Sequence, residues 1–206
     1  MFRRLGGAIA LLTAVGASAS AQVSATFYHI PEDPGAPNHD ASFSTTPYCS
    51  TSIFGGASGF SVDFLDPTTR AGIAALCPGT TQADFLHNFA VRFSGSLTVA
   101  GTGSYSVFLN TDDGSIFTVN GTPYYDGWVA QGAGPGTLNG ILLNAGLNSF
   151  GLDYFENSYG GAYATLQVGQ GIVAEPTTVP EPASMALLGT GLVGVFGAVR
   201  RRIKTI

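Results

Sequence analysis

Residues 103–128 read GSYSVFLNTDDGSIFTVNGTPYYDGW. On either side of an acidic Asp112-Asp113-Gly114 loop, apolar side chains occupy every second position. Successive side chains of a strand point to opposite faces, so each run predicts a strand with one buried face. The Asn120-Gly121 pair is the strongest short-range signal for a tight turn. The stretch therefore predicts a strand, an acidic loop, a second strand and a tight turn, with these residues on the buried faces: Tyr105, Val107, Leu109, Phe117 and Val119.

The order of these features resembles the PA14 domain. It runs Gly-x-Tyr from Gly103, a strand, Asp-Asp-Gly, a strand, Asn-Gly and Asp-x-Trp ending at Trp128. The resemblance spans about Val23 to Val168 and is weakest between Pro31 and Asp84. PA14 domains are β-sandwiches found in bacterial toxins, glycosidases and fungal adhesins. The resemblance thus implies an all-β fold, a PA14-type antiparallel β-sandwich that we expect over residues 22–174.

The resemblance also implies a calcium site. In lectin-like PA14 domains two aspartates joined by a cis peptide hold a calcium ion that binds sugar hydroxyls, and these fall on Asp112 and Asp113. A further ligand comes from the loop after the penultimate strand, here residues 156–161, where Asn157 would offer a side-chain oxygen and Glu156 a charge. Calcium takes six to eight oxygen ligands, which such side chains can supply. The alternative is an Asp-Asp-Gly turn whose carboxylates only accept backbone N–H bonds.

Trp128 is the remaining candidate for carbohydrate binding, because an indole ring can stack on a sugar. The alternative is a core tryptophan with Asp126 bracing the adjacent turn. Enzymatic activity is not expected, since the chain contains no Gly-x-Ser-x-Gly elbow and its three histidines are isolated. Two adjacent aspartates also cannot flank a sugar across the ~5 Å or more that glycoside hydrolysis requires.

Both ends of the chain carry targeting signals. Residues 1–21 have a basic start, an apolar core and a small-x-small cleavage pattern, which predicts a secretory signal peptide. A Pro/Thr linker at 175–182 leads to an uncharged apolar segment at 183–199 and a basic tail at 200–206. The apolar segment is slightly short for a spanning helix of ~20 residues but long enough for a thin bilayer.

This C-terminal region resembles the PEP-CTERM sorting signal of Gram-negative bacteria, with its motif at Pro180, Glu181 and Pro182. The resemblance implies processing by an exosortase, with a transmembrane sorting helix held transiently in the inner membrane and the basic tail in the cytoplasm. A permanent single-pass anchor is the alternative. Either interpretation places residues 22–178 outside the inner membrane.

An oxidising destination favours a disulfide between the only two cysteines, Cys49 and Cys77. Free thiols or metal ligands are the alternatives. Nearby, Asp66 and Pro67 predict the N-terminus of a short helix that continues from Thr68 to Leu76.

The charge distribution excludes nucleic acid as a partner. Of the eight basic residues only Arg70 and Arg92 lie between the targeting segments, whereas the chain has 13 acidic residues. We expect an exported carbohydrate-binding protein of the cell surface or extracellular matrix, whose partner is exopolysaccharide or a cell-surface glycan. A structural biofilm matrix protein without a ligand site is the alternative.

Overall fold

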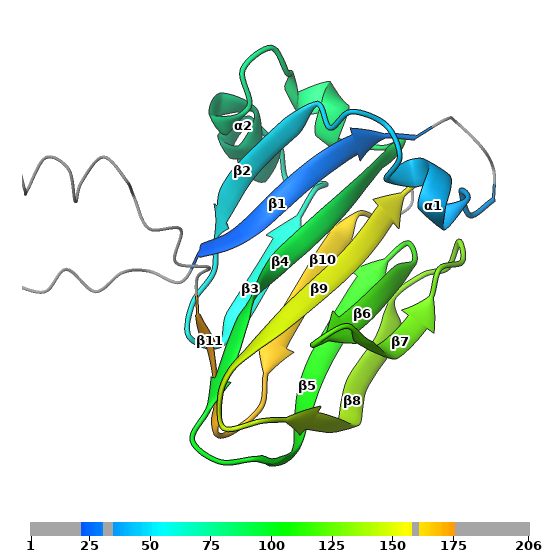
Figure 1. Ribbon diagram of the computed structural model, residues 1–206. Helices are drawn as coiled ribbons and strands as arrows, with labels where there is room; N and C mark the ends of the chain where they lie inside the picture. The colour runs from blue at the N-terminus through cyan, green and yellow to red at the C-terminus, as the bar shows by residue number, and fades with distance from the viewer. Residues whose placement is uncertain (1–21, 31–34, 158–160, 176–206) are drawn as a thin grey trace, which may run out of the picture. The chain divides into compact units, whose positions relative to one another are not determined.

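The computed structural model describes residues 22–30, 35–157 and 161–175. The predicted signal peptide, the Pro-Glu-Pro motif, the apolar segment and the basic tail lie outside these ranges. Within them the chain forms two antiparallel sheets that face one another, as Figure 1 shows. None of the helices in the described ranges is long and apolar enough to cross a membrane.

The two sheets differ in size. In spatial order, sheet A is β2 (Cys49–Phe54), β1 (Gln22–His29), β4 (Phe89–Val99), β9 (Gly146–Glu156), β6 (Ser115–Val119) and β7 (Thr122–Gly127), and β11 (Ile172–Glu175) also pairs with β4. Sheet B is β3 (Gly59–Asp63), β10 (Tyr163–Val168), β5 (Gly103–Asp112) and β8 (Gly134–Leu143). Every pairing among these strands is antiparallel. The predicted antiparallel β-sandwich is therefore confirmed.

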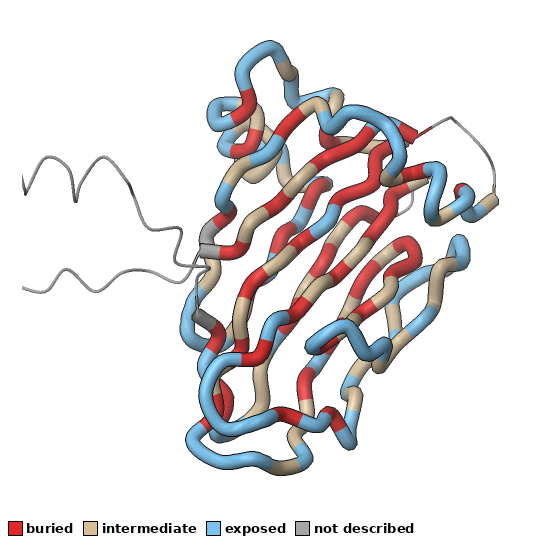
Figure 2. Tube along the Cα trace, in the orientation of Figure 1, coloured by how far each residue is buried: buried red, intermediate tan, exposed pale blue. Residues whose placement is uncertain are grey.

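The core lies between the sheets and follows the period-two pattern of the sequence. Buried residues alternate with more exposed ones along most strands. In Figure 2 the red of buried residues therefore alternates with tan or pale blue along these strands. Each fully buried large apolar side chain contributes about 1.5 to 3 kcal/mol. The largest of them in the core between the sheets are Tyr154, Phe27, Phe64, Phe85, Phe89, Phe93 and Phe117.

The acidic loop links the two sheets and does not close a hairpin. β5 pairs with β10 and β8 in sheet B, whereas β6 pairs with β7 and β9 in sheet A. Asp112, Asp113 and Gly114 therefore lie where the chain crosses from one layer to the other. The predicted tight turn does close a hairpin, between β6 and β7, with φ of 50° at Asn120 and 78° at Gly121.

Three short helices flank the sheets in the described part of the chain. α2 (Pro67–Leu76) begins at Asp66, whose carboxylate accepts the backbone N–H groups of Thr68 and Thr69, as the sequence predicts. The 3₁₀ helix η1 (Gln82–Phe85) follows it, and α1 (His39–Ser42) lies in the connection from β1 to β2. The α1, β2, β7 and β11 elements were not predicted from the sequence pattern.

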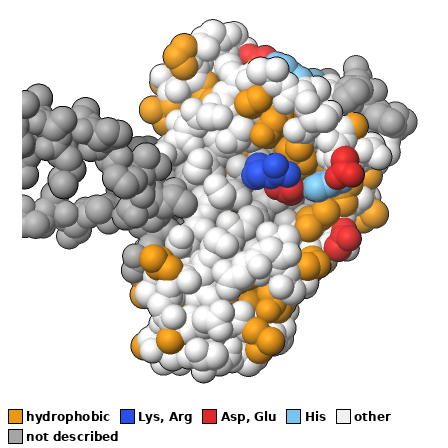
Figure 3. Space-filling view, in the orientation of Figure 1, with side chains coloured by type: hydrophobic (Ala, Val, Ile, Leu, Met, Phe, Trp, Pro, Cys, Tyr) orange, Lys and Arg blue, Asp and Glu red, His pale blue; other side chains and the backbone are white. Residues whose placement is uncertain are grey.

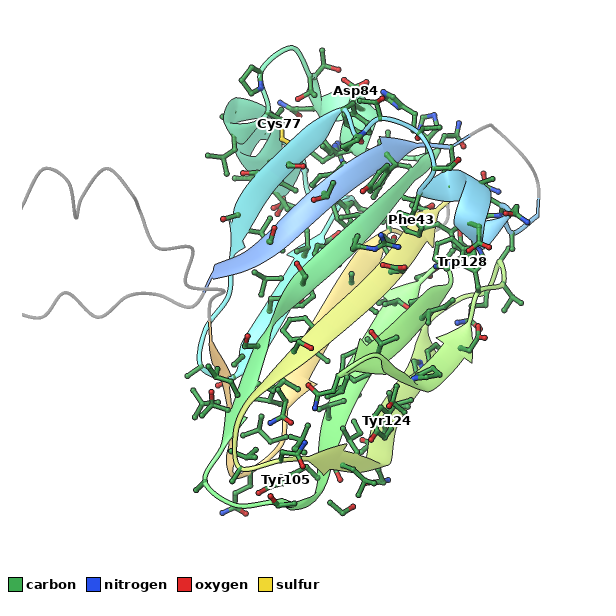
Figure 4. All side chains as sticks on the ribbon, in the orientation of Figure 1. Phe43, Cys77, Asp84, Tyr105, Tyr124 and Trp128 are labelled. Atoms are coloured by element: carbon green, nitrogen blue, oxygen red, sulfur yellow. A yellow bond between two sulfur atoms is a disulfide. The ribbon has the colours of Figure 1, made fainter. Side chains whose placement is uncertain are left out.

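The predicted disulfide between Cys49 and Cys77 is present and joins the start of β2 to the end of α2. Figure 4 labels Cys77 beside these elements. Both cysteines are buried, at 6% and 2% exposure. The disulfide therefore fastens α2 against the edge of sheet A.

Removing this disulfide should destabilise the domain. The cysteines are 28 positions apart, and a closed loop of this size stabilises by about 3 to 4 kcal/mol through the restricted unfolded chain. We expect a Cys49→Ala, Cys77→Ala double variant to lose that much free energy of unfolding, measured by denaturant titration. The parent under reducing conditions provides the control. Equal denaturation midpoints for the oxidised parent and the double variant would contradict this role.

Candidate functional site

The candidate site is built on the sheet-crossing loop. The peptide bond between Asp112 and Asp113 is cis, as the resemblance implied. Asp112 is the last residue of β5 and pairs with Tyr163 of β10. Asp113 is 4% exposed. Its Oδ1 accepts the backbone N–H of Gln131 at 3.2 Å, and its Oδ2 accepts that of Asn157 at 3.1 Å. The Asp113 carboxylate thus joins the loop after β7 to the loop after β9.

Tyr154 supports the crossing from inside the sandwich. It is fully buried on the core face of β9. Its hydroxyl lies 2.5 Å from the backbone oxygen of Asp112 and 3.1 Å from Oε2 of Glu156. Burial, together with the negative charge of Glu156, raises the pKa of Tyr154 well above its ordinary value. The hydroxyl therefore stays protonated and serves as a hydrogen-bond donor.

The two aspartates carry negative charge, and no basic side chain of the described residues pairs with either of them. Burial raises the pKa of Asp112, and the charge of Asp113 raises it further. Burial also raises the pKa of Asp113, an effect that the N–H groups of Asn157 and Gln131 partly offset. In residues 22–30, 35–157 and 161–175 the ion pairs involve His39 and Arg92 and reach neither aspartate. A bound cation would relieve this charge.

Two glycines allow the loops to approach the aspartates. A Cβ at Gly161 would overlap the Asp112 carboxylate, so that side chain lies directly against the glycine backbone. A Cβ at Gly114 would lie only 2.6 Å from the Gly127 carbonyl oxygen and 2.7 Å from the Phe155 ring. Gly114 therefore requires a residue without a side chain, whereas a Cβ at Gly161 would displace the Asp112 carboxylate.

The oxygen-rich residues fit calcium, although acidic side chains alone do not complete a site. The described part of the chain has no group of three or more His, Cys, Asp or Glu side chains placed to hold a metal. Calcium also accepts amide and backbone carbonyl oxygens and water. Asp112 and Asp113 would therefore be joined by an amide oxygen such as that of Asn157, by carbonyl groups and by water.

The C-terminal region of the sequence matches a known family. Residues 178–202 match the family described as the PEP-CTERM protein-sorting motif. Such a signal indicates an exported protein that is sorted to the cell envelope. No match was found among curated proteins.

The fold of the described domain is similar to that of a solved structure. The PA14 domain of the antifreeze protein MpAFP superposes with a TM-score of 0.52 at 15% identity, over 78% of this chain and 93% of that one. The described domain has the PA14 fold.

Two further structures are similar at lower scores. The PA14 sugar-binding domain from an RTX adhesin has a TM-score of 0.48 at 19% identity, with coverage of 73% of this chain and 89% of that one. An anti-sigma factor domain-containing protein from Clostridium clariflavum has a TM-score of 0.46 at 13% identity, with 77% and 42% coverage. This chain thus spans less than half the length of the clostridial protein.

Within the described domain Trp128 is engaged by protein groups. Its Nε1–H donates to the Pro37 carbonyl oxygen at 2.7 Å. The indole lies 4.7 Å from the Phe155 ring and 4.8 Å from the His39 ring, measured between centroids. Figure 4 shows Trp128 directed toward Phe43 below α1. These contacts attach the loop after β7 to the segment before α1.

Glu156 does not lie on the rim of the site, where the sequence interpretation placed it. It is 0% exposed, since it shares the core face of β9 with Leu152 and Tyr154. The loop begins one residue later than the sequence suggested, so this carboxylate cannot contact a glycan in solution. Asn157 does lie at the site, through its N–H bond to Asp113.

Sequence reasoning missed Gln131, Gly161 and the Tyr154 hydroxyl. Gln131 follows no recognisable motif, and it reaches Asp113 through its backbone. Only the Gly160-Gly161 pair gave a local signal, because paired glycines often mark close backbone approach.

Asp112→Asn should stabilise the metal-free domain at neutral pH. A pKa raised in the folded state means that the folded protein binds the proton more readily than the unfolded chain. The destabilisation is therefore complete above the folded-state pKa and disappears as the pH falls toward the ordinary pKa of aspartate. We expect the variant to melt at higher temperature than the parent at pH 7 in chelator, with a gap that narrows toward pH 4.

Asp126→Asn is the matched control, because Asp126 carries an exposed carboxylate on the nearby strand β7. Its melting temperature should follow that of the parent at every pH. A metal-free Asp112→Asn variant that melts below the parent at pH 7 would contradict the proposed repulsion.

Proposed function

We propose that this exported protein binds glycans through a calcium ion held by Asp112 and Asp113. The observation that carries the proposal is a pair of adjoining carboxylates with raised pKa and no cationic partner in the described part of the chain. A divalent cation would neutralise both charges. Asn157, whose backbone already contacts Asp113, would add a side-chain oxygen.

The protein groups around the ion have separate tasks in this proposal. Asp113 cannot turn freely, since both of its oxygens accept backbone N–H groups from different loops. Asp112 is more exposed and faces the Gly161 backbone. A bound calcium ion would supply open coordination positions for two neighbouring sugar hydroxyls, while the loop at 127–131 and Asn157 select among sugars. Such an open site buries little ligand surface, so affinity for each sugar should be weak.

The same geometry supports binding and not hydrolysis. Glycosidases place two carboxyl groups on opposite sides of the scissile bond, about 5 Å or more apart. Adjacent residues in one loop cannot surround a sugar in this way. The proposed partners are therefore an exopolysaccharide or a cell-surface glycan, and an exosortase that recognises Pro180, Glu181 and Pro182 during export.

A structural matrix protein without a ligand is the second candidate. The observation that favours it is the lack, in the described ranges, of a third acidic or histidine side chain beside the aspartates. Calcium dependence separates the two candidates, because a purely structural sandwich should not respond to a chelator.

Calcium titration of the full chain by calorimetry and thermal melting tests the proposal directly. We expect saturable binding and a raised melting temperature in the parent, because a ligand that binds only the folded state stabilises it. Asp112→Asn and Asp113→Asn should abolish both effects, whereas Asp126→Asn should retain them. A glycan array with and without chelator then identifies the sugar. A parent that neither binds calcium nor changes its melting temperature would leave the structural role as the better account.

Gly161→Ala should weaken calcium binding without unfolding the domain. The added Cβ would overlap only the end of a flexible side chain, so the Asp112 carboxylate can swing aside. It would then lie away from the proposed ion. We expect a loss of calcium affinity in calorimetry with little change in the melting temperature measured in chelator.

Gly132→Ala is its control, since a Cβ at Gly132 meets nothing within 4 Å. This variant should bind calcium like the parent. Unchanged affinity in Gly161→Ala would mean that the Asp112 carboxylate does not need its present position for binding.

A further inference from the structure

A segment from Gly35 to Phe43, called the α1 segment below, covers part of the outer face of sheet A. Phe43 packs edge-on against Tyr28 of β1, with 5.1 Å between ring centroids. Phe43 also lies 5.8 Å from Trp128, which in turn contacts Phe155 of β9. Together with Ile30 and Ala90 these residues form a second apolar cluster, separate from the core between the sheets.

A charged cluster fastens this segment to the sheet. Asp153 of β9 receives two hydrogen bonds from Arg92 of β4, at 2.7 Å from Nε and 2.8 Å from Nη2. His39 of α1 lies 2.9 Å from the same carboxylate through Nε2. The Asp153 side chain is only 15% exposed. Figure 3 shows this face, where basic, acidic and histidine side chains gather among hydrophobic ones.

Arg92 completes the attachment from the sheet side. Its guanidinium lies 4.3 Å from the centroid of the Phe43 ring, within the range of a cation–π contact. The hydrogen bonds to Asp153 raise the pKa of Arg92. Asp153 is therefore shared by the sheet and the α1 segment, and its partners hold both ends of α1.

The start of the α1 segment contacts both loops that hold Asp113. The Gly35 carbonyl oxygen accepts the Asn157 side-chain amide, and the Pro37 carbonyl oxygen accepts the Trp128 indole N–H. Asn157 donates its backbone N–H to Asp113, and Gln131, three residues after Trp128, does the same. A continuous set of contacts therefore leads from Asp153 through the α1 segment to Asp113.

We propose that the α1 segment is part of the ligand site, with Asp153 and His39 as positioning residues that hold the segment in place. Through the segment, these two residues also hold Asn157 and the 128–131 loop around Asp113. This inference rests on the proposed function for the presence of a cation at Asp112 and Asp113. α1 itself has only four residues, so its own hydrogen bonds contribute little and side-chain contacts must keep it in place. If the α1 segment were released, calcium binding would have to order these loops again. That cost would lower the affinity for calcium.

The single tryptophan makes this arrangement measurable. Trp128 is the only one in the chain, and its indole touches the α1 segment through both Pro37 and Phe43. Its fluorescence emission therefore reports the attachment of the segment, and calcium calorimetry on the same full-length protein reports the site. A residue that only contributed to global stability would not change both at temperatures well below melting.

We expect His39→Ala and Asp153→Asn to move the Trp128 emission to longer wavelength and to weaken calcium binding on the order of tenfold, within the usual range of coupling between sites. His39→Ala leaves the Arg92–Asp153 pair intact and so keeps the test usable if Asp153→Asn folds poorly. Asp126→Asn is the matched control. Its carboxylate is exposed on β7, outside the α1 segment and its charged cluster, so parent-like emission and affinity are expected.

The outcomes separate this inference from the proposed function. A shifted emission with parent-like calcium affinity would overturn the positioning role, because the segment would be free while the site stayed intact. An unshifted emission in both variants would overturn it as well, since the charged cluster would then not hold the segment. A parent that binds no calcium would overturn the proposed function, and the positioning role would fall with it.

Discussion

The buried carboxylate of Asp113 is the group that holds together the two loops beside the crossing from β5 to β6. It lies where the chain leaves one sheet for the other, and it accepts backbone N–H groups from two loops that have no strand pairing with each other. Backbone donors without a partner are strongly disfavoured inside a protein, and a charged acceptor satisfies two of them at once. The loop at 127–131 and the start of the loop after β9, at Asn157, are therefore organised around this side chain.

That arrangement has an electrostatic consequence. Asp113 is kept largely out of water, and Asp112 stands next to it, so that burial and mutual repulsion both favour the neutral forms. Two N–H groups compensate Asp113 only in part, and the described chain supplies no positive side chain. Proteins that retain a charge in such a place commonly pair it with a metal ion or a charged ligand. The case for a cation thus comes from the charges themselves and does not depend on the proposed sugar binding.

Local patterns predicted the parts of the fold that depend on neighbouring residues in the chain. Alternating apolar residues identified β5 and β6, Asp66 identified the start of α2, and Asn120-Gly121 identified the hairpin turn. Periodicity cannot assign two consecutive strands to different sheets, which is why the crossing at Asp112 was not foreseen. Contacts such as Trp128 to Pro37 join residues 91 positions apart through a backbone carbonyl, and no side-chain pattern records them. Glu156 was misplaced because strand ends are the least certain boundaries of any sequence reading.

β9 shows how one strand can serve a site from both faces. Its core-facing residues include Tyr154, whose hydroxyl holds the Asp112 backbone from inside the sandwich. Its outward-facing residues include Asp153 and Phe155, which hold the α1 segment and Trp128. Because successive side chains alternate between faces, a shift of one residue in the register of β9 would turn Tyr154 outward and Asp153 and Phe155 into the core. Both sets of contacts would then be lost. The pairing of β9 with β4 over eleven residues fixes that register. The positions of the β9 side chains around the site therefore depend on strand pairing at the centre of sheet A.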